Sequence, residues 1–120
     1  MKSMKSMELS KEMQTCIDAC LSCYTRCEEA LNHCLQQGGQ HADPQMIRTL
    51  TDCAEMSRMC AEMMMRMSPM SSEMCAMVAR MCDMCADACM RMPDDAMMMR
   101  CADSCTECAQ ACRAMMKTMA

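Results

Sequence analysis

Apolar and polar residues recur along the chain with the 3.6-residue period of the α-helix, and short breaks divide this pattern. Gly38-Gly39 ends a first helical stretch that begins near residue 9. Asp43-Pro44 opens a second stretch, with aspartate as the N-cap and proline at the first helical position. The sequence therefore predicts a break between two long helices at residues 38–43.

Two further breaks divide the second half of the chain. Ser68-Pro69 ends the second stretch, and Ser71 or Ser72 can cap a third. Pro93-Asp94-Asp95 ends the third stretch near residue 91 and starts a fourth, which continues almost to the C-terminus. Short connections between long helices make neighbouring helices antiparallel.

The predicted fold class is all-α, an antiparallel up-down-up-down four-helix bundle. Its four helices are expected to be roughly 20 to 28 residues long, with boundaries accurate to a few residues. We expect the bundle to occupy residues 9–120 and residues 1–8, MKSMKSME, to form a flexible N-terminal tail.

The inner face of each predicted helix is built from cysteine, where leucine would be usual. At about 100° per residue, the cysteines of the first and fourth helices fall within arcs of about 60°, and those of the third within about 80°. The cysteines are Cys16, Cys20, Cys23, Cys27, Cys34, Cys53, Cys60, Cys75, Cys82, Cys85, Cys89, Cys101, Cys105, Cys108 and Cys112.

The second helix carries only two cysteines, and methionines complete its apolar stripe. These are Met46, Met56, Met64 and Met67. Charged residues such as Glu28, Asp87 and Glu107 lie on the faces opposite the stripes. Each stripe must therefore face the bundle axis, which predicts a core made of a column of sulfur atoms.

The composition indicates that this sulfur has a use. The 120 residues include 15 Cys and 24 Met, with no Phe or Trp. A core of cysteine and alanine buries less apolar area per position than leucine does, so it contributes less stability. One or two buried cysteines are explained as small hydrophobic residues, but fifteen are poorly explained in this way.

Three observations argue against a secreted disulfide scaffold, the usual meaning of so much cysteine. The cysteine count is odd, the intervening residues favour helix, and the N-terminal segment lacks the apolar centre of an export signal. On a helix, Cβ atoms four residues apart are separated by about 5–6 Å, whereas a disulfide needs about 3.8 Å. We therefore expect free thiols and a cytoplasmic location.

Other classes of function fit poorly. The net charge of −4 gives no basic surface for nucleic acid, and no apolar run is long enough for a membrane span. The CxxC pairs Cys20/Cys23, Cys82/Cys85 and Cys105/Cys108 lie in mid-helix. A thioredoxin-type site needs its CxxC at a helix N-terminus. We therefore expect no enzymatic activity.

The chemistry of the ligands favours a soft monovalent metal. Four thiolates around Zn²⁺ leave a net charge of −2, which is costly to repeat in one dry core. Iron–sulfur clusters usually take cysteines from irregular loops. One Cu(I) per thiolate leaves the core neutral, and methionine thioethers also suit Cu(I). The sequence thus predicts multiple Cu(I) ions per chain, with Ag(I) chemically similar.

Softer and mixed ligands gather at both ends of the predicted bundle. One end carries His33, His41, Met46, Met92, Met97 and Met98. The other carries Met13, Met64, Met67, Met74, Met115 and Met119. Both histidines are at the first end, which we predict to be the metal entrance, while the methionines of the second end keep it as the alternative entrance. We add His33, His41, Met46, Met64, Met97 and Met98 to the cysteines as candidate metal ligands.

The segments CIDACLSCYTRCEEALNHC at 16–34, CDMCADAC at 82–89 and CADSCTECAQAC at 101–112 resemble the four-helix-bundle copper storage proteins of bacteria. That resemblance implies Cu(I) bound mainly by CxxxC pairs along the core and metal uptake at one bundle end through His and Met. It also implies a homo-oligomer, often a tetramer. The chain departs from this pattern in having two cysteines on the second helix and AMMMR before Cys101.

Together these features predict cytosolic storage or sequestration of Cu(I), with a copper chaperone as a candidate partner and without contact to nucleic acid or membrane. Two alternatives stay open at this point. One is a zinc or iron–sulfur protein with a structural or electron-transfer role. The other is a plain helical module that binds a protein partner.

Overall fold

The structure, a computed structural model, describes residues 9–119 of the chain. Its elements are α2 (Lys11–Gln37), the short 3₁₀ helix η1 (Gly39–Ala42), α3 (Pro44–Met65), α4 (Ser71–Cys89) and α5 (Ala96–Met119). The predicted all-α fold class is confirmed, and residues 9–119 contain no strand. The flexible tail predicted for residues 1–8 lies outside the described residues.

The first two helices start at side-chain caps. Ser10 precedes α2, and its Oγ accepts a hydrogen bond from the Met13 backbone N–H at 3.1 Å. Asp43 precedes α3, and its carboxylate accepts from the Gln45 N–H at 3.1 Å, with Pro44 at the first helical position. These contacts satisfy backbone donors that a helix start leaves without partners.

The start of α4 differs from the prediction. Ser71 is the first helical residue, so neither it nor Ser72 is the cap, and Met70 occupies that position without a side-chain hydrogen bond to the helix. The turn is held by Ser68 instead. Its Oγ accepts from the Met70 N–H at 3.1 Å, and its carbonyl accepts from the Ser71 hydroxyl at 2.8 Å.

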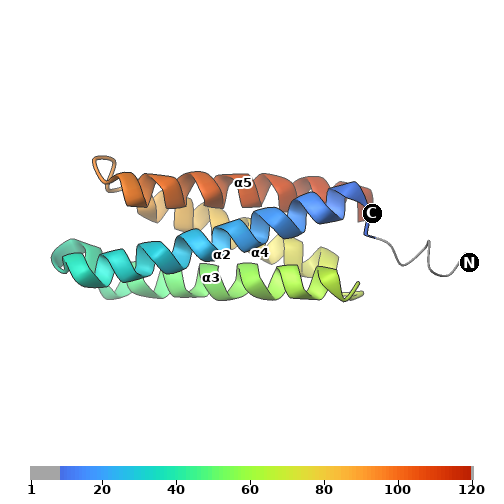
Figure 1. Cartoon of the computed structure of the whole chain (residues 1–120), viewed down its shortest axis with the longest axis horizontal. Helices are drawn as coiled ribbons and strands as arrows, with labels where there is room; N and C mark the ends of the chain where they lie inside the picture. Colours follow the sequence, from blue (N-terminus) through green and yellow to red (C-terminus); the bar gives the residue numbers. More distant parts are fainter. Residues whose placement is uncertain (1–8, 120) are drawn as a thin grey trace, which may run out of the picture.

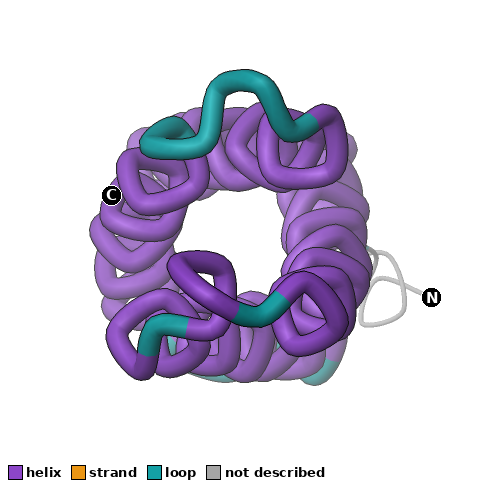
Figure 2. Tube along the Cα trace, turned by 90° about the vertical axis from the view of Figure 1, so that its left-hand side faces the viewer, coloured by secondary structure: helices purple, strands orange, loops and turns teal. Residues whose placement is uncertain are grey.

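The four long helices form a bundle measuring 57 × 20 × 20 Å (Figure 1). Each helix packs against the next in the chain, and α5 packs against α2 to close the ring seen in Figure 2. The α2–α3 and α4–α5 connections lie at one end, called here the η1 end. The α3–α4 turn lies at the opposite end with the C-terminus of α5, and is called the α3–α4 end.

Every cysteine side chain is buried and none forms a disulfide. Alanines and a few aliphatic residues such as Leu50 and Val78 fill the spaces around them, while Glu28, Asp87 and Glu107 are exposed. The predicted orientation of the cysteine stripes is therefore confirmed. No helix among the described residues has the length and apolar character to cross a membrane.

The methionines follow the predicted stripe of α3 only in part. Met46 and Met64 are buried as expected. Met67 is exposed, because α3 ends at Met65 and the chain turns with a positive φ of 56° at Met67. Its predicted place on the core stripe is wrong. The side chain of Met119, also predicted for this end, lies outside the described residues.

Candidate metal centre

One cysteine from each helix meets at the middle of the bundle. The Cys23 Sγ of α2 lies 3.9 Å from Cys53 of α3, 3.8 Å from Cys82 of α4 and 3.7 Å from Cys105 of α5, measured between sulfurs. Cys53 also lies 3.9 Å from Cys82 and 4.0 Å from Cys105. The helical period places these thiols on inner faces, and the packing of the helices aligns them in one layer.

Further sulfurs extend this layer toward the η1 end. Cys27 Sγ lies 3.7 Å from Cys101, 3.9 Å from Cys105 and 4.0 Å from Cys85. Beyond them, Cys34 Sγ lies 3.6 Å from the thioether sulfur of Met98. The column therefore ends on a buried methionine at this end.

The column also extends toward the α3–α4 end. Cys20 Sγ lies 3.6 Å from Cys108 and 3.9 Å from Cys112, and Cys112 lies 3.8 Å from Cys16. A neighbouring pair, Cys60 and Cys75, has its sulfurs 3.8 Å apart. Thiols from all four helices thus follow one another along the bundle axis.

These spacings suit a metal between sulfurs. The distances of 3.6 to 4.0 Å are about twice the S–S bond length of roughly 2.05 Å. A metal at about 2.3 Å from each of two thiolates separates them by roughly 3.8 to 4.6 Å. Metal binding therefore requires little movement of these side chains.

The sulfurs gather into groups whose ligand atoms all lie within 4.8 Å of one another. Two groups of four are Cys23/Cys27/Cys53/Cys105 and Cys27/Cys85/Cys101/Cys105. Groups of three include Cys16/Cys75/Cys112, Cys20/Cys108/Cys112 and Cys23/Cys82/Cys108. Helical spacing predicted ligand pairs within a helix, but it missed these groups across helices because it carries no information on how the helices align.

Burial and mutual contact shape the acidity of the thiols. Burial raises the pKa of Cys34 to about 11, helped by the negative charges of Asp95 and Cys101. Deeper in the column, the hydrogen bond with Cys101 raises the pKa of Cys27 above its usual value. Neutral thiols are therefore the resting form of these two cysteines, and a positive ion must displace protons to bind there.

Both histidines share one carboxylate at the η1 end. The Nε2 atoms of His33 and His41 lie 2.7 and 2.9 Å from Oδ2 of Asp95. The other oxygen of Asp95 accepts from the backbone N–H groups of Met97 and Met98 and caps α5. The hydrogen bond from His33 is the main reason that the pKa of Asp95 is lowered. The sequence predicted both histidines here but gave no signal for Asp95 as their partner.

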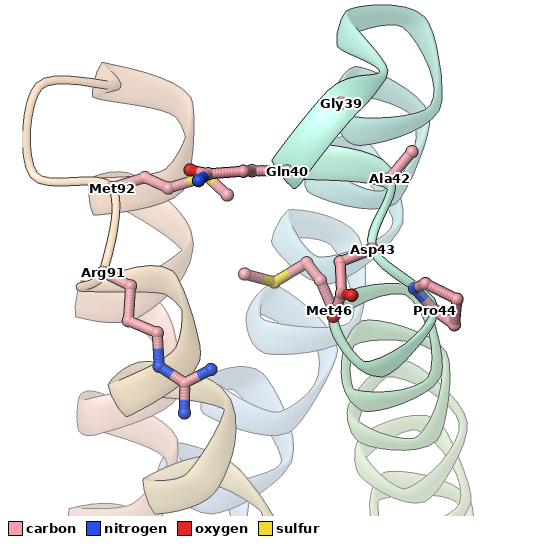
Figure 3. Close-up of a pocket in the computed structure, with 8 residues that line it drawn as sticks. All are labelled: Gly39, Gln40, Ala42, Asp43, Pro44, Met46, Arg91 and Met92. Carbon is pink, nitrogen blue, oxygen red and sulfur yellow. The ribbon is translucent and has the colours of Figure 1, made fainter.

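The remaining candidates at this end lie in two different environments. Met46 is buried and lines a pocket of about 620 Å³ that Gln40, Arg91 and Met92 also border (Figure 3). Met97 is only half-buried, and its sulfur lies 3.9 Å from the Arg100 guanidinium. The structure therefore joins Met98 to the thiol column and turns the sulfur of Met97 toward Arg100.

The profile of the copper storage protein (Csp) family matches residues 9–117. The chain belongs to the copper storage protein family. No curated protein matches it, but solved structures of copper storage proteins do. Cu(I)-bound copper storage protein BsCsp3 is 31% identical, with a TM-score of 0.82 over 88% of this chain and 98% of that one.

Two more structures resemble this copper storage family member. Apo-Csp3 from Bacillus subtilis is 30% identical, with a TM-score of 0.76 over 86% of this chain and 97% of that one. The Nmul_A1745 protein from Nitrosospira multiformis is 36% identical, with a TM-score of 0.82 over 90% and 97% of the two chains. The family and the bundle fold predicted from the sequence are both confirmed.

Proposed function

We propose that the bundle stores Cu(I) as a column of thiolate-bound ions, at close to one ion per cysteine. The observation that carries this proposal is the series of sulfur contacts at 3.6 to 4.0 Å along a core with no disulfide. Such a core can hold many ions that share ligands between adjacent sites. In this proposal every thiol serves as a Cu(I) ligand for storage or sequestration, and none takes part in a catalytic step.

The charge of the core distinguishes Cu(I) from zinc. Across residues 9–118 the buried polar side chains are Thr49, Ser57, Ser71 and Ser104, none of which carries a charge. A Zn²⁺ ion with four thiolates would leave an excess charge of −2 that no buried cation offsets. One Cu(I) per thiolate leaves no excess charge, so the whole column can fill.

We propose that copper enters at the η1 end. His33 and His41 are half-buried and share Asp95, which also accepts from the Met98 N–H, and the Met98 sulfur contacts Cys34 of the column. An ion bound first by imidazole or thioether can exchange onto the Cys34 thiolate and release its proton. We propose Met46 and Met97 as auxiliary ligands, with Met97 available only when its sulfur leaves Arg100.

The same proposal concerns the setting in which the protein works. Free thiols persist in a reducing compartment, so we propose a cytoplasmic location. A copper chaperone is the natural donor, because free Cu(I) is scarce where thiols are abundant. Exposed Met77 and Met84 on α4 are candidates for contacts in a homo-oligomer, with a tetramer expected from the family resemblance.

Anaerobic titration of the reduced protein with Cu(I) against a coloured Cu(I) chelator tests the proposal. We expect saturation near 15 ions per chain, one for each cysteine. Saturation near three or four ions would instead fit tetrahedral zinc-like sites. Metal analysis after growth with copper, zinc or iron, together with the visible absorption band of iron–sulfur clusters, tests the alternative zinc or iron–sulfur function.

A further inference from the structure

The α3–α4 end of the bundle is lined with thioethers. Each helix contributes at least one methionine that belongs to the core or packs against it. They are Met13, Met64, Met74, Met115 and Met116. Both histidines of the chain lie at the η1 end, so the two ends of the column differ in chemistry. Thioethers bind soft monovalent ions and bind divalent zinc poorly.

The sulfur column reaches these methionines. Met64 is fully buried, and its sulfur lies 3.9 Å from Cys75 Sγ, which lies 3.8 Å from Cys60 Sγ. The pair Met64 and Cys75 thus repeats the pair Met98 and Cys34 at the opposite end, where the sulfurs are 3.6 Å apart. A thiol–thioether contact closes the column at both ends.

The backbone next to Met64 supplies a second observation. The Ser68 N–H bonds to the Met63 carbonyl and the Met67 N–H to the Met64 carbonyl, both at 2.9 Å, which is the Schellman arrangement at a helix end. Met67 occupies its left-handed position, with φ of 56°. Glycine usually fills this position because any side chain is strained there.

Packing does not explain the methionine at this strained position. The Met67 side chain is 40% exposed and that of Met70, in the same turn, is 54% exposed. These side chains therefore bring thioether sulfur to the surface a few residues from Met64. The chain accepts local strain while leaving the methionine accessible to solvent, which points to a role for its sulfur.

We propose that the α3–α4 end is a second port, through which soft monovalent ions pass between solution and the thiol column. Met67 meets the ion at the surface, and Met64 with Cys60 and Cys75 forms the first internal site. One thiol loses its proton to solvent as Cu(I) binds, and the neutral thioethers exchange without proton transfer. The inference rests on the proposed function, since a port needs a column that stores Cu(I).

The test measures the rate at which the reduced protein takes Cu(I) from a coloured chelator complex, together with the final number of ions bound. Met67→Leu removes the sulfur and keeps the strained backbone position. Met67→Gly removes the sulfur and relieves the strain. Met64→Leu conserves volume and removes the inner thioether. The matched control is Met59→Leu, an exposed methionine of α3 two helical turns before the turn at residues 66–70.

With two parallel ports, we expect each variant of Met64 or Met67 alone to lower the loading rate by about half. When His33→Gln and His41→Gln also weaken the η1 end, we expect the same variants to lower the rate by about tenfold. The Met59→Leu control should load at the original rate. Met67→Gly should load as slowly as Met67→Leu although it unfolds at a higher temperature. A purely structural Met67 would change only that temperature.

Unchanged loading rates in Met67→Leu and Met64→Leu, in both backgrounds, would overturn the second port and leave copper storage intact. A wild-type protein that binds only a few Cu(I) ions would overturn the storage function, and the port with it. Final capacity near fifteen ions in the Met67 variants, reached more slowly, supports both.

Discussion

Cys23 and Cys105 are 82 positions apart in the chain, yet their sulfur atoms lie 3.7 Å apart at the middle of the bundle. Cys53 and Cys82 join them from the other two helices. Contacts between all four helices are therefore made through sulfur at the point where a bundle normally packs leucine. The structural core and the proposed metal store are the same set of atoms.

Replacing Cys23 should lower metal capacity more than it lowers stability. We expect Cys23→Ala to lose one or two Cu(I) ions, because Cys23 belongs to two of the sulfur groups. Removing one small buried side chain should cost about 1 kcal/mol of unfolding free energy. Cu(I) titration and urea unfolding measure the two effects. Capacity unchanged from wild type would exclude Cys23 as a ligand.

Copper binding should weaken as the pH falls. The pKa of Cys34 is raised to about 11, so this thiol is protonated at neutral pH and must lose its proton to bind metal. Each such site then loses about tenfold in affinity for every unit of pH decrease. Proton release during loading and chelator competition between pH 6 and 8 measure this. A pH-independent affinity would show that Cys34 does not bind as a thiolate.

Asp95 should stabilise the η1 end in a pH-dependent way. The pKa of Asp95 is lower in the folded state than in the unfolded state. Its contribution to the free energy of unfolding is therefore complete above the unfolded pKa of about 4, and it is lost as the pH falls from there through the lower folded-state pKa. Asp95→Ala removes the α5 cap and should cost about 1 kcal/mol at pH 7. Urea unfolding of the apo-protein at pH 7 and pH 3 measures the difference.

The matched variant Asp95→Asn separates the two roles of this side chain. Asparagine caps helices well, so it can keep the bonds to Met97 and Met98. It lacks the charge that faces His33 and His41. We expect Asp95→Asn to be more stable than Asp95→Ala at pH 7. Equal stabilities of these two variants would show that the cap contributes nothing.

The apo-protein should already be helical. The helices contain many Ala, Met, Glu and Arg residues, all of which favour helix, and Ser10, Asp43 and Asp95 cap three of them. We therefore expect strong helical circular dichroism in reduced, metal-free protein, and little gain on loading with Cu(I). A coil-like spectrum that becomes helical only with copper would contradict this expectation.

The sequence predicted the burial of the cysteines well, because the helical period alone decides which residues share a face. Helix ends marked by Asp43-Pro44 and Gly38 were also predicted, since these residues restrict the backbone locally. The Met67 position was missed because its turn places methionine where glycine is expected. Local preferences gave no means to foresee that exception.

The sequence could not predict which residues of different helices come into contact, for a different reason. The period shows that Cys16, Cys75 and Cys112 all face inward, but their meeting depends on how three helices slide against each other. The bond of His33 and His41 to Asp95 likewise depends on two connections folding toward each other. The orientation of Met97 was settled by its neighbour Arg100 rather than by the stripe.

A core of cysteine and alanine also makes the stability of the protein depend on the copper that it binds. Small side chains hold the empty bundle together weakly, whereas each ion that joins several helices strengthens it. Proteases degrade proteins through transient unfolding. We therefore expect a cell to degrade the metal-free protein faster than the copper-loaded protein, so that degradation adjusts the amount of protein to the amount of stored copper.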